Sequence, residues 1–331
     1  MARGKRGRIT HFGEADGAAC YCQSPPTARS RTLFAAPPVI ETEIFARVPD
    51  ALRQHHNPRH QSGVPRDCFI EGPSFDRDGN LYITNIPYGQ VFKISPSGEF
   101  TVVATYDGEP NGLKIHRDGR IFIADHSRGL MVIDPSAGKA EVFLDRPHRE
   151  RFKGLNDLHF AQNGDLYFTD QGESGLHDPT GRLWRLRHSG RLDLLLHNVP
   201  SPNGLVLTPD ESILYLAATR GNAVWRVPLH PDGSVGRVGI FIQMSGGMGP
   251  DGMAMDSEGN LAICHVGMGS VWVFSRLGRP LYELPSCAGR ATTNAAYGGP
   301  DGKTLYITES ETGAILRAKL PVAGLPLYSH Q

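Results

Sequence analysis

Six oxygen-bearing side chains recur at one fixed place in a repeated pattern, and their types are those of ligands for a hard metal ion. Each stands eight residues before a tight-turn position, and we call them the register positions: Glu71, Asn111, Asn156, Asn203, Asp251 and Asn294. Carboxylate and carboxamide oxygens suit Ca²⁺ first and Mg²⁺ or Mn²⁺ next, with Zn²⁺ as a further alternative. The two carboxylates, Glu71 and Asp251, would balance a divalent charge and the Asn oxygens would add coordination without repulsion, so the pattern predicts one divalent cation at the axis.

The register positions belong to a repeated β-hairpin, whose clearest copy runs from Glu71 to Thr84. A polar residue is followed by a short apolar segment, an Asp-Gly turn and a second apolar segment, as in two antiparallel strands. Six copies recur with a period of about 40 to 48 residues, the range of propeller blades. The sequence therefore predicts an all-β fold: a six-bladed β-propeller of four-stranded antiparallel blades around a central metal channel.

A single Asn-Gly pair would indicate only a turn. The eight-residue spacing is shared by all six copies and includes Glu71 and Asp251, which favours a site over six separate turns.

Each blade must carry its register position to the axis. In the first blade we expect strands over residues 72–75, 81–84, 90–94 and 100–104. Counting chain reversals places the register positions and the loops between second and third strands on one face. The loop 170–181 is the longest of these, so we expect it to cover the pocket. Residues 39–48 read as a strand that pairs with the last blade and closes the ring.

Composition limits the classes of function. The 331-residue chain has 34 basic and 34 acidic side chains, so no basic surface for nucleic acid or an anionic membrane is expected. Five scattered cysteines indicate neither a disulfide framework nor a zinc site. No apolar run approaches the roughly 18 residues of a membrane span. No apolar segment of a secretory signal follows the basic N-terminus. We expect a cytoplasmic protein that acts on a small molecule.

Residues 1–39 are rich in Arg, Ser, Pro and Ala and lack an apolar period, so we predict a disordered extension before a single propeller domain over 40–331. Before the first blade, His55, His56 and His60 suggest a metal site, but they lie outside any repeat that would fix their geometry. A solvated loop is the expected state. Nothing in the sequence indicates the oligomeric state.

Four motifs, in order along the chain, resemble those of a known family of six-bladed propellers. They are Glu71-Gly72-Pro73, Asn156-Asp157, Ser201-Pro202-Asn203-Gly204 and Gly249-Pro250-Asp251-Gly252-Met253. Together they resemble the SMP-30/gluconolactonase/luciferin-regenerating family. The resemblance implies a divalent cation held by Glu71, Asn203 and Asp251, with Asn156 near both metal and substrate. It also implies hydrolysis of lactones or related esters. Asn111 and Asn294 match the register and are expected to line the substrate pocket.

The predicted reaction is metal-assisted hydrolysis, in which the cation polarises the carbonyl and an activated water attacks its carbon. Asp251 is the first candidate for the base, although coordination to a metal lowers the basicity of a carboxylate. His265, expected on the rim loop after the Asp251 hairpin, is the second candidate. His126 occupies a similar place in the second blade, where we expect it to contact substrate.

Two other functions use the same features. A phosphotriesterase or arylesterase would direct the same cation at a different electrophile, and a non-catalytic binding scaffold would hold a structural cation. A scaffold does not need two carboxylates and several carboxamides at its axis, which favours the enzyme. No G-x-S-x-G motif occurs, so a serine nucleophile is not indicated.

Overall fold

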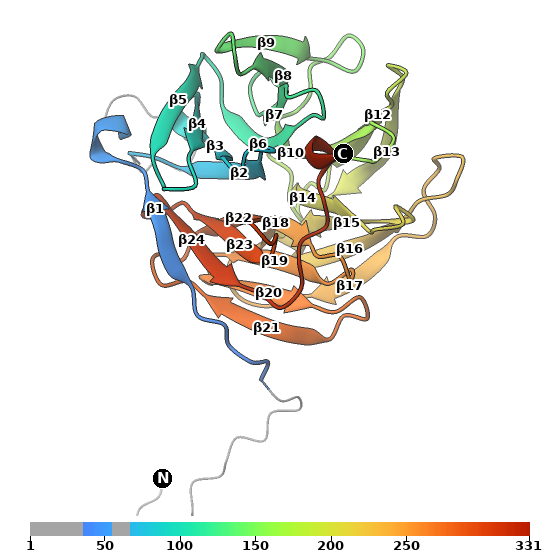
Figure 1. The fold of residues 1–331 in the computed structure, drawn as a ribbon. Helices are drawn as coiled ribbons and strands as arrows, with labels where there is room; N and C mark the ends of the chain where they lie inside the picture. Colours follow the sequence, from blue (N-terminus) through green and yellow to red (C-terminus); the bar gives the residue numbers. More distant parts are fainter. Residues whose placement is uncertain (1–35, 55–66) are drawn as a thin grey trace, which may run out of the picture. The chain divides into compact units, whose positions relative to one another are not determined.

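Six four-stranded antiparallel sheets follow one another along the chain and surround a common axis (Figure 1). The innermost strands are β2 (Ile70–Phe75), β6 (Pro110–Ile115), β10 (Leu155–Phe160), β14 (Pro202–Leu207), β18 (Gly249–Met255) and β22 (Thr292–Gly298). Each contacts the next, and β22 contacts β2, so the ring is closed. The six-bladed β-propeller is therefore confirmed.

The outer strands complete the blades in order. They are β3 (Leu81–Asn85), β4 (Gln90–Ile94) and β5 (Phe100–Thr105); β7 (Ile121–Asp125), β8 (Gly129–Asp134) and β9 (Lys139–Leu144); β11 (Leu166–Asp170), β12 (Gly181–Leu186) and β13 (Leu192–Val199); β15 (Ile213–Ala218), β16 (Ala223–Pro228) and β17 (Gly239–Gln243); β19 (Leu261–Val266), β20 (Ser270–Phe274) and β21 (Pro280–Pro285); and β23 (Thr304–Glu309), β24 (Ala314–Lys319) and β1 (Glu43–Arg47). In the first blade the observed bounds differ from the predicted ones by two residues at most.

The strand before the first blade closes the ring, as predicted. β1 pairs antiparallel with β24, so the last blade takes one strand from the N-terminal side of the chain. The strand is shorter than the predicted 39–48, because Val39 instead forms an isolated parallel bridge with Glu283 of the fifth blade. Closure pairs an edge strand that would otherwise expose its backbone groups.

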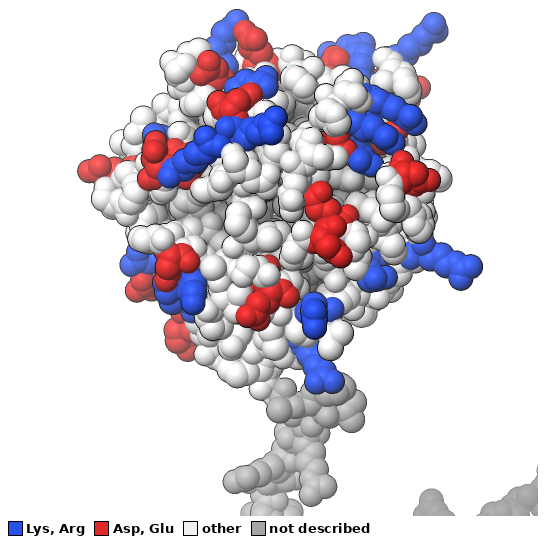
Figure 2. Space-filling view, turned by 45° about the vertical axis from the view of Figure 1, so that its right-hand side comes forward, with Lys and Arg blue, Asp and Glu red and all other residues white. Residues whose placement is uncertain are grey.

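The fold is described in a computed structural model for residues 36–54 and 67–331. Residues 37–331 form one compact unit. The predicted extension lies almost wholly outside the described residues, as do His55, His56 and His60. No helix within the described ranges is long and apolar enough to cross a membrane. Acidic and basic groups are intermixed on the face seen in Figure 2.

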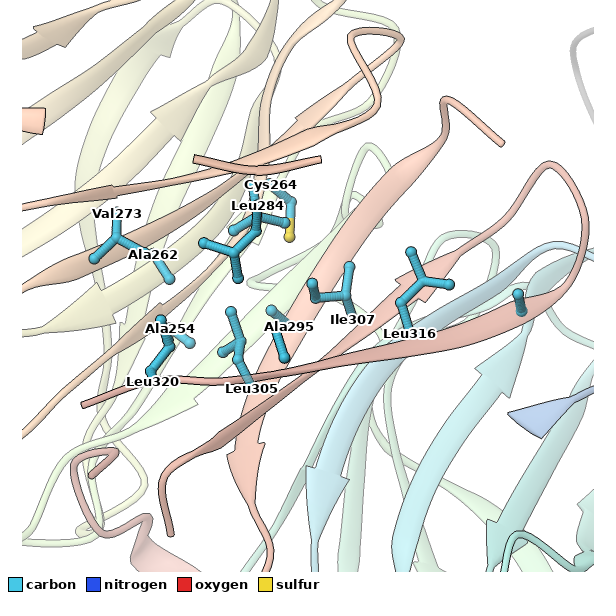
Figure 3. Close-up of a cluster of buried hydrophobic side chains, with 13 residues drawn as sticks. Ala254, Ala262, Cys264, Val273, Leu284, Ala295, Leu305, Ile307, Leu316 and Leu320 are labelled. Carbon is cyan, nitrogen blue, oxygen red and sulfur yellow. The ribbon is translucent and has the colours of Figure 1, made fainter. Parts of the chain in front are cut away.

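The apolar core lies between blades rather than at the axis. The described residues form six buried clusters, one at each interface between neighbouring blades. Figure 3 shows the cluster between the last two blades, where Ala254 and Ala262 face Leu305 and Leu320. Small residues opposite large ones let twisted sheets approach closely. Because the core is displaced to these interfaces, the axis is left for polar groups.

The end of the chain lies near the centre of the ring (Figure 1). There η4 (Tyr328–His330) follows a segment that runs back from the last blade. The ring of Tyr328 stacks on Phe160 at 5.2 Å and meets the edge of His116 at 5.0 Å. Lys114 and His159 line a small cavity with Tyr328 and Gln331. The C-terminal segment therefore packs over the axis on the hairpin side of the propeller.

Candidate active site

A β-bulge accompanies the register position in every innermost strand. The pairing with the second strand of the blade shifts between Glu71 and Ser74 in β2. Four other innermost strands shift across their register position, whereas in β22 the shift lies earlier, between Thr292 and Asn294. A bulge bends the strand and re-aims a side chain, so these bulges turn the register side chains toward the axis. The prediction that the first strand begins after Glu71 is wrong, since β2 begins at Ile70 and includes it.

Glycine follows four of the six register positions, and the reason is the spacing between blades. A Cβ added to Gly204 would lie 2.4 Å from the backbone oxygen of Asp251, and one on Gly252 would lie 2.1 Å from Asn294. Contacts this short are not seen for real side chains, so only glycine allows neighbouring inner strands to approach this closely. The Asn-Gly pairs are therefore contacts between blades and not turns.

Threonine hydroxyls hold adjacent blades in alignment at the same level. Thr84, in β3, donates to the backbone oxygen of Asn111 in the second blade at 2.7 Å. Thr169, in β11, donates to the backbone oxygen of Asn203 in the fourth blade at 3.0 Å. Both bonds are buried or partly buried, where a hydrogen bond is costly to break. They fix the height of the register positions along the axis.

One pocket of about 250 Å³ brings together most of the predicted residues. Six of the eight line it: Glu71, Asn111, His126, Asn156, Asn203 and Asp251. The wall is completed by the apolar side chains of Phe69, Ile86, Met248 and Val266, and by the polar residues Glu109, Gln171, Ser201, Thr219 and Arg220. The register residues thus form a polar floor beneath a mixed rim, the usual composition of a small-molecule site.

The carboxylates of this floor are buried and close enough to repel one another. Burial raises the pKa of Glu71, and the charge of Asp157 raises it further. Burial also raises the pKa of Asp251, with contributions from Glu71 and Asp157. Neither Glu71 nor Asp251 forms an ion pair with any described residue, although Asn203 donates a hydrogen bond to Asp251 and Arg220 lies near enough to favour its charge. The carboxylates of the floor are therefore costly to ionise together, and a bound cation would favour their charged forms.

Asn156 is oriented by a chain of hydrogen bonds from the third blade to the fourth. Its amide nitrogen donates to Gln171 at 3.1 Å, and the amide of Gln171 donates to the hydroxyl of Ser201 at 2.8 Å. With its nitrogen engaged, the carboxamide oxygen of Asn156 remains as an acceptor or metal ligand. Gln171 is the only residue of the loop 170–181 that lines this pocket, and residues 171–177 border a neighbouring hollow.

Asn294 and His265 do not line the pocket. Asn294 is 2% exposed and donates to Glu71 at 3.0 Å and to Asp157 at 3.3 Å, so it bridges two carboxylates beneath the floor. His265 lies within β19 rather than on a rim loop, and it is 1% exposed. Its Nε2 lies 3.0 Å from the backbone oxygen of Gly246, and burial lowers its pKa.

Sequence reasoning missed the third carboxylate of the site, Asp157. This side chain is 3% exposed, and burial raises its pKa while the charge of Lys114 lowers it. The sequence did contain a signal for this residue. Four register positions are followed by glycine, whereas Asn156 is followed by Asp157. Gly112 leaves the room it needs, since a Cβ there would lie 2.2 Å from an Asp157 oxygen.

The donor set fits a hard cation. It combines two buried carboxylates, Glu71 and Asp251, with the carboxamides of Asn156 and Asn203, all facing one pocket. The described residues contain no group of three or more His, Cys, Asp or Glu side chains arranged to hold a metal. The four residues supply oxygen donors only, so a cation bound here would be coordinated by carboxamide oxygens as well as carboxylates.

Comparison with known proteins identifies the family. Residues 69–311 match the model of the SMP-30/Gluconolactonase/LRE-like region. The chain belongs to this family. A gluconolactonase of Zymomonas mobilis is 30% identical over 284 residues, covering 76% of this chain and 79% of that protein. The lactonase drp35 of a Staphylococcus aureus strain is 28% identical over 227 residues, covering 65% of this chain and 69% of that protein.

Solved structures share the architecture of this family member. A calcium-binding protein described as regucalcin, from Agrobacterium tumefaciens, superposes with a TM-score of 0.72 at 23% identity, covering 89% of this chain and all of that one (100%). A gluconolactonase from Xanthomonas campestris superposes with a TM-score of 0.69 at 21% identity, covering 87% and 96%. At these identities the likeness shows the fold alone.

Proposed function

We propose that this protein is a divalent-metal-dependent hydrolase that opens lactones. The observation that carries the proposal is the convergence of Glu71, Asn156, Asn203 and Asp251 on one pocket whose carboxylates lack ion-pair partners. Gluconolactonase and lactonase relatives support the reaction class. The calcium-binding structural neighbour supports Ca²⁺ as the first candidate for the metal.

The cation would be held by Glu71, Asn156, Asn203 and Asp251. When bound, it would act as a Lewis acid that polarises the lactone carbonyl and stabilises the developing oxyanion. Asn294 keeps Glu71 in place from below through its 3.0 Å hydrogen bond. Gln171 holds the amide of Asn156 so that its oxygen faces the pocket. These supporting contacts fix the donor geometry before substrate arrives.

Asp251 is the proposed base. It would accept a proton from the attacking water as the water oxygen bonds to the carbonyl carbon. The ring C–O bond would then break, and the ring oxygen would take up the proton to give a hydroxy acid. His265 was the second candidate, but it does not line the pocket, whereas His126 does. We infer that His126 would contact the ring hydroxyls or the leaving oxygen of a substrate.

Metal removal and replacement test the proposal. Protein stripped with a chelator should lose hydrolysis of glucono-δ-lactone and regain it with Ca²⁺, Mg²⁺, Mn²⁺ or Zn²⁺ in a metal-specific order. Glu71→Gln keeps the side-chain shape and should lower kcat/KM by at least about 100-fold, as expected when electrostatic stabilisation of an oxyanion is lost. Glu99→Gln, at an exposed carboxylate far along the same blade, is the control. Equal lactone turnover by stripped and loaded protein would refute the proposal.

The same experiment separates the alternatives. An aryl ester and an organophosphate triester, assayed beside the lactone, would show whether the metal site prefers a different electrophile. A folded, metal-loaded protein that turns over none of the three would favour a binding scaffold.

A further inference from the structure

Arg220 is a cation on the pocket rim that lies near enough to Asp251 to favour its charge but forms no ion pair with a residue of the described chain. It lies in η3 (Thr219–Gly221), directly after β15, and lines both the axial pocket and the hollow under the loop 170–181. Its side chain is exposed, and its guanidinium makes no hydrogen bond or ion pair with any residue in the described ranges. The axial pocket is lined by no other Lys or Arg of the described chain.

Three other arginines on this face are paired with carboxylates. Arg53 contacts Asp67 at 2.9 Å, Arg128 pairs with Asp107, and Arg182 lies 3.4 Å from Asp170. Pairing satisfies the planar fork of a guanidinium, which matches a carboxylate or phosphate with two parallel hydrogen bonds. The guanidinium of Arg220 therefore remains free to bind a carboxylate or phosphate of a ligand, whereas these three arginines already bind carboxylates of the protein.

The backbone that carries Arg220 is fixed beside the metal floor. The hydroxyl of Thr219 donates to the backbone oxygen of Pro250, the residue before Asp251, at 2.7 Å. On the other side, the amide of Asn222 donates to the backbone oxygen of Gly246 at 2.9 Å. A Cβ on Gly249 would lie 2.1 Å from the backbone oxygen of Thr219, so the turn is packed tightly against β18. The guanidinium is thus presented from a rigid base next to Asp251.

The remaining walls differ in character. Glu109 and His126 lie together in the second blade, joined by a backbone hydrogen bond of 3.0 Å, and Glu109 already has an interaction within the protein. Apolar side chains come from the first blade (Phe69, Ile86) and the fifth (Met248, Val266). Once a divalent cation balances Glu71 and Asp251, the charge of Asp251 that acts on Arg220 is offset, and the remaining carboxylate, Asp157, has Lys114 nearby.

We propose that Arg220 is a specificity residue that binds an anionic group of the substrate, so that the preferred substrate is a lactone bearing a carboxylate or phosphate away from its ring carbonyl. The inference rests on the proposed lactonase function. The ring carbonyl faces the floor of register residues, and the anionic group extends toward the fourth blade. There the two parallel N–H groups of Arg220 bind two of its oxygens, and the hollow bordered by Gln171 and Ser174 leaves room for it.

The test compares lactones with and without an anionic group away from the ring carbonyl. The Ca²⁺-loaded protein is assayed with glucono-δ-lactone and with its 6-phosphate, and glucaro-1,4-lactone supplies the carboxylate arm. We expect kcat/KM for at least one anionic lactone to exceed that for the neutral one by about 10- to 100-fold, the value of a charge-assisted bidentate contact. In Arg220→Gln the kcat/KM for the anionic lactone should fall toward that for the neutral one, mainly through a higher KM. Arg220→Lys should restore only part of the difference. Arg226→Gln, at an exposed arginine of the same blade that does not line the pocket, should keep it.

A binding measurement separates failure of this inference from failure of the lactonase proposal. Titration of 6-phosphogluconate into Ca²⁺-loaded protein should show binding that Arg220→Gln weakens at least tenfold and Arg226→Gln does not. If no lactone is hydrolysed but this difference is observed, the anion site stands and the lactonase proposal falls. If lactones are hydrolysed with no preference for charge, or with a preference that Arg220→Gln leaves intact, the anion site is refuted. Absence of both turnover and binding overturns both.

Discussion

Replacing Gly204 by alanine should damage the site without touching any of its functional side chains. The new Cβ would lie 2.4 Å from the backbone oxygen of Asp251 and 2.7 Å from the Cα of Gly252, where ordinary contact begins at 3.4 Å. Both neighbours are backbone atoms of the next blade, so they cannot rotate away. β18 must therefore move outward by about 1 Å. The backbone of Gly204 has no positive φ, so crowding is the only penalty.

The expected magnitudes follow from this displacement. Overpacking of this kind costs about 1 to 3 kcal/mol of unfolding free energy. A shift of about 1 Å in Asp251 should lower kcat/KM for the lactone by about 100-fold. Urea unfolding and steady-state lactone hydrolysis, both in Ca²⁺, measure the two effects. Gly239→Ala is the matched control, because a Cβ there meets no atom within 4 Å. If Gly204→Ala were as stable and as active as this control, the close approach of blades at the axis would be wrong.

Three further predictions concern buried groups around the axis. Burial lowers the pKa of His159 from 6.5 to about 3, so the unfolded state binds more protons between these pH values and stability is lost as pH falls below 6.5. At pH 5 the loss of unfolding free energy relative to pH 7 is about 2 kcal/mol. Urea unfolding at both pH values measures it, and His159→Leu should remove this difference. An unchanged pH dependence in the variant would contradict a buried neutral imidazole. Asp157→Asn should weaken Ca²⁺ binding by about 10- to 100-fold. It should also raise the melting temperature of the metal-stripped protein, because it removes one of three carboxylates that repel one another. Calorimetry with and without chelator measures both effects, and a lower melting temperature of the stripped variant would contradict the repulsion. His126→Gln should lower kcat/KM for lactone more than His265→Gln, since only His126 lines the pocket; the reverse order would return His265 to the site.

Much of the architecture was predictable because each repeat is specified by residues that are close together in the sequence. An Asp-Gly turn between two apolar segments specifies a hairpin, and six such hairpins at one period leave a ring as the arrangement that pairs their edges. The oxygen-bearing residue eight positions before each turn was visible for the same reason. Its place on one face followed from counting strand reversals, and five of these six residues do line the pocket.

The errors come from features that local patterns do not encode. Asn294 shares the register of Glu71, but the shift in β22 falls between Thr292 and Asn294 rather than after the register position. Its side chain is therefore directed beneath the floor. His265 was expected on the loop after the second strand of its blade. In the structure β19 extends to Val266, so His265 lies within the strand and is buried. Strand length and bulge position depend on pairing with neighbours, which is a property of the assembled sheet.

The sequence by itself determined the number of blades, their order and the oxygen-bearing residues of the register, because turn chemistry and apolar alternation are properties of short segments. Only the tertiary structure decided which oxygens share one pocket, since that depends on six bulges and on glycines where adjacent strands nearly touch. It also brought Asp157 close to Glu71 and Asp251, and left Arg220 on the rim without an ion-pair partner among the described residues. Carboxylates from blades far apart in the chain meet only at the axis, so their mutual repulsion appears only once the ring is closed.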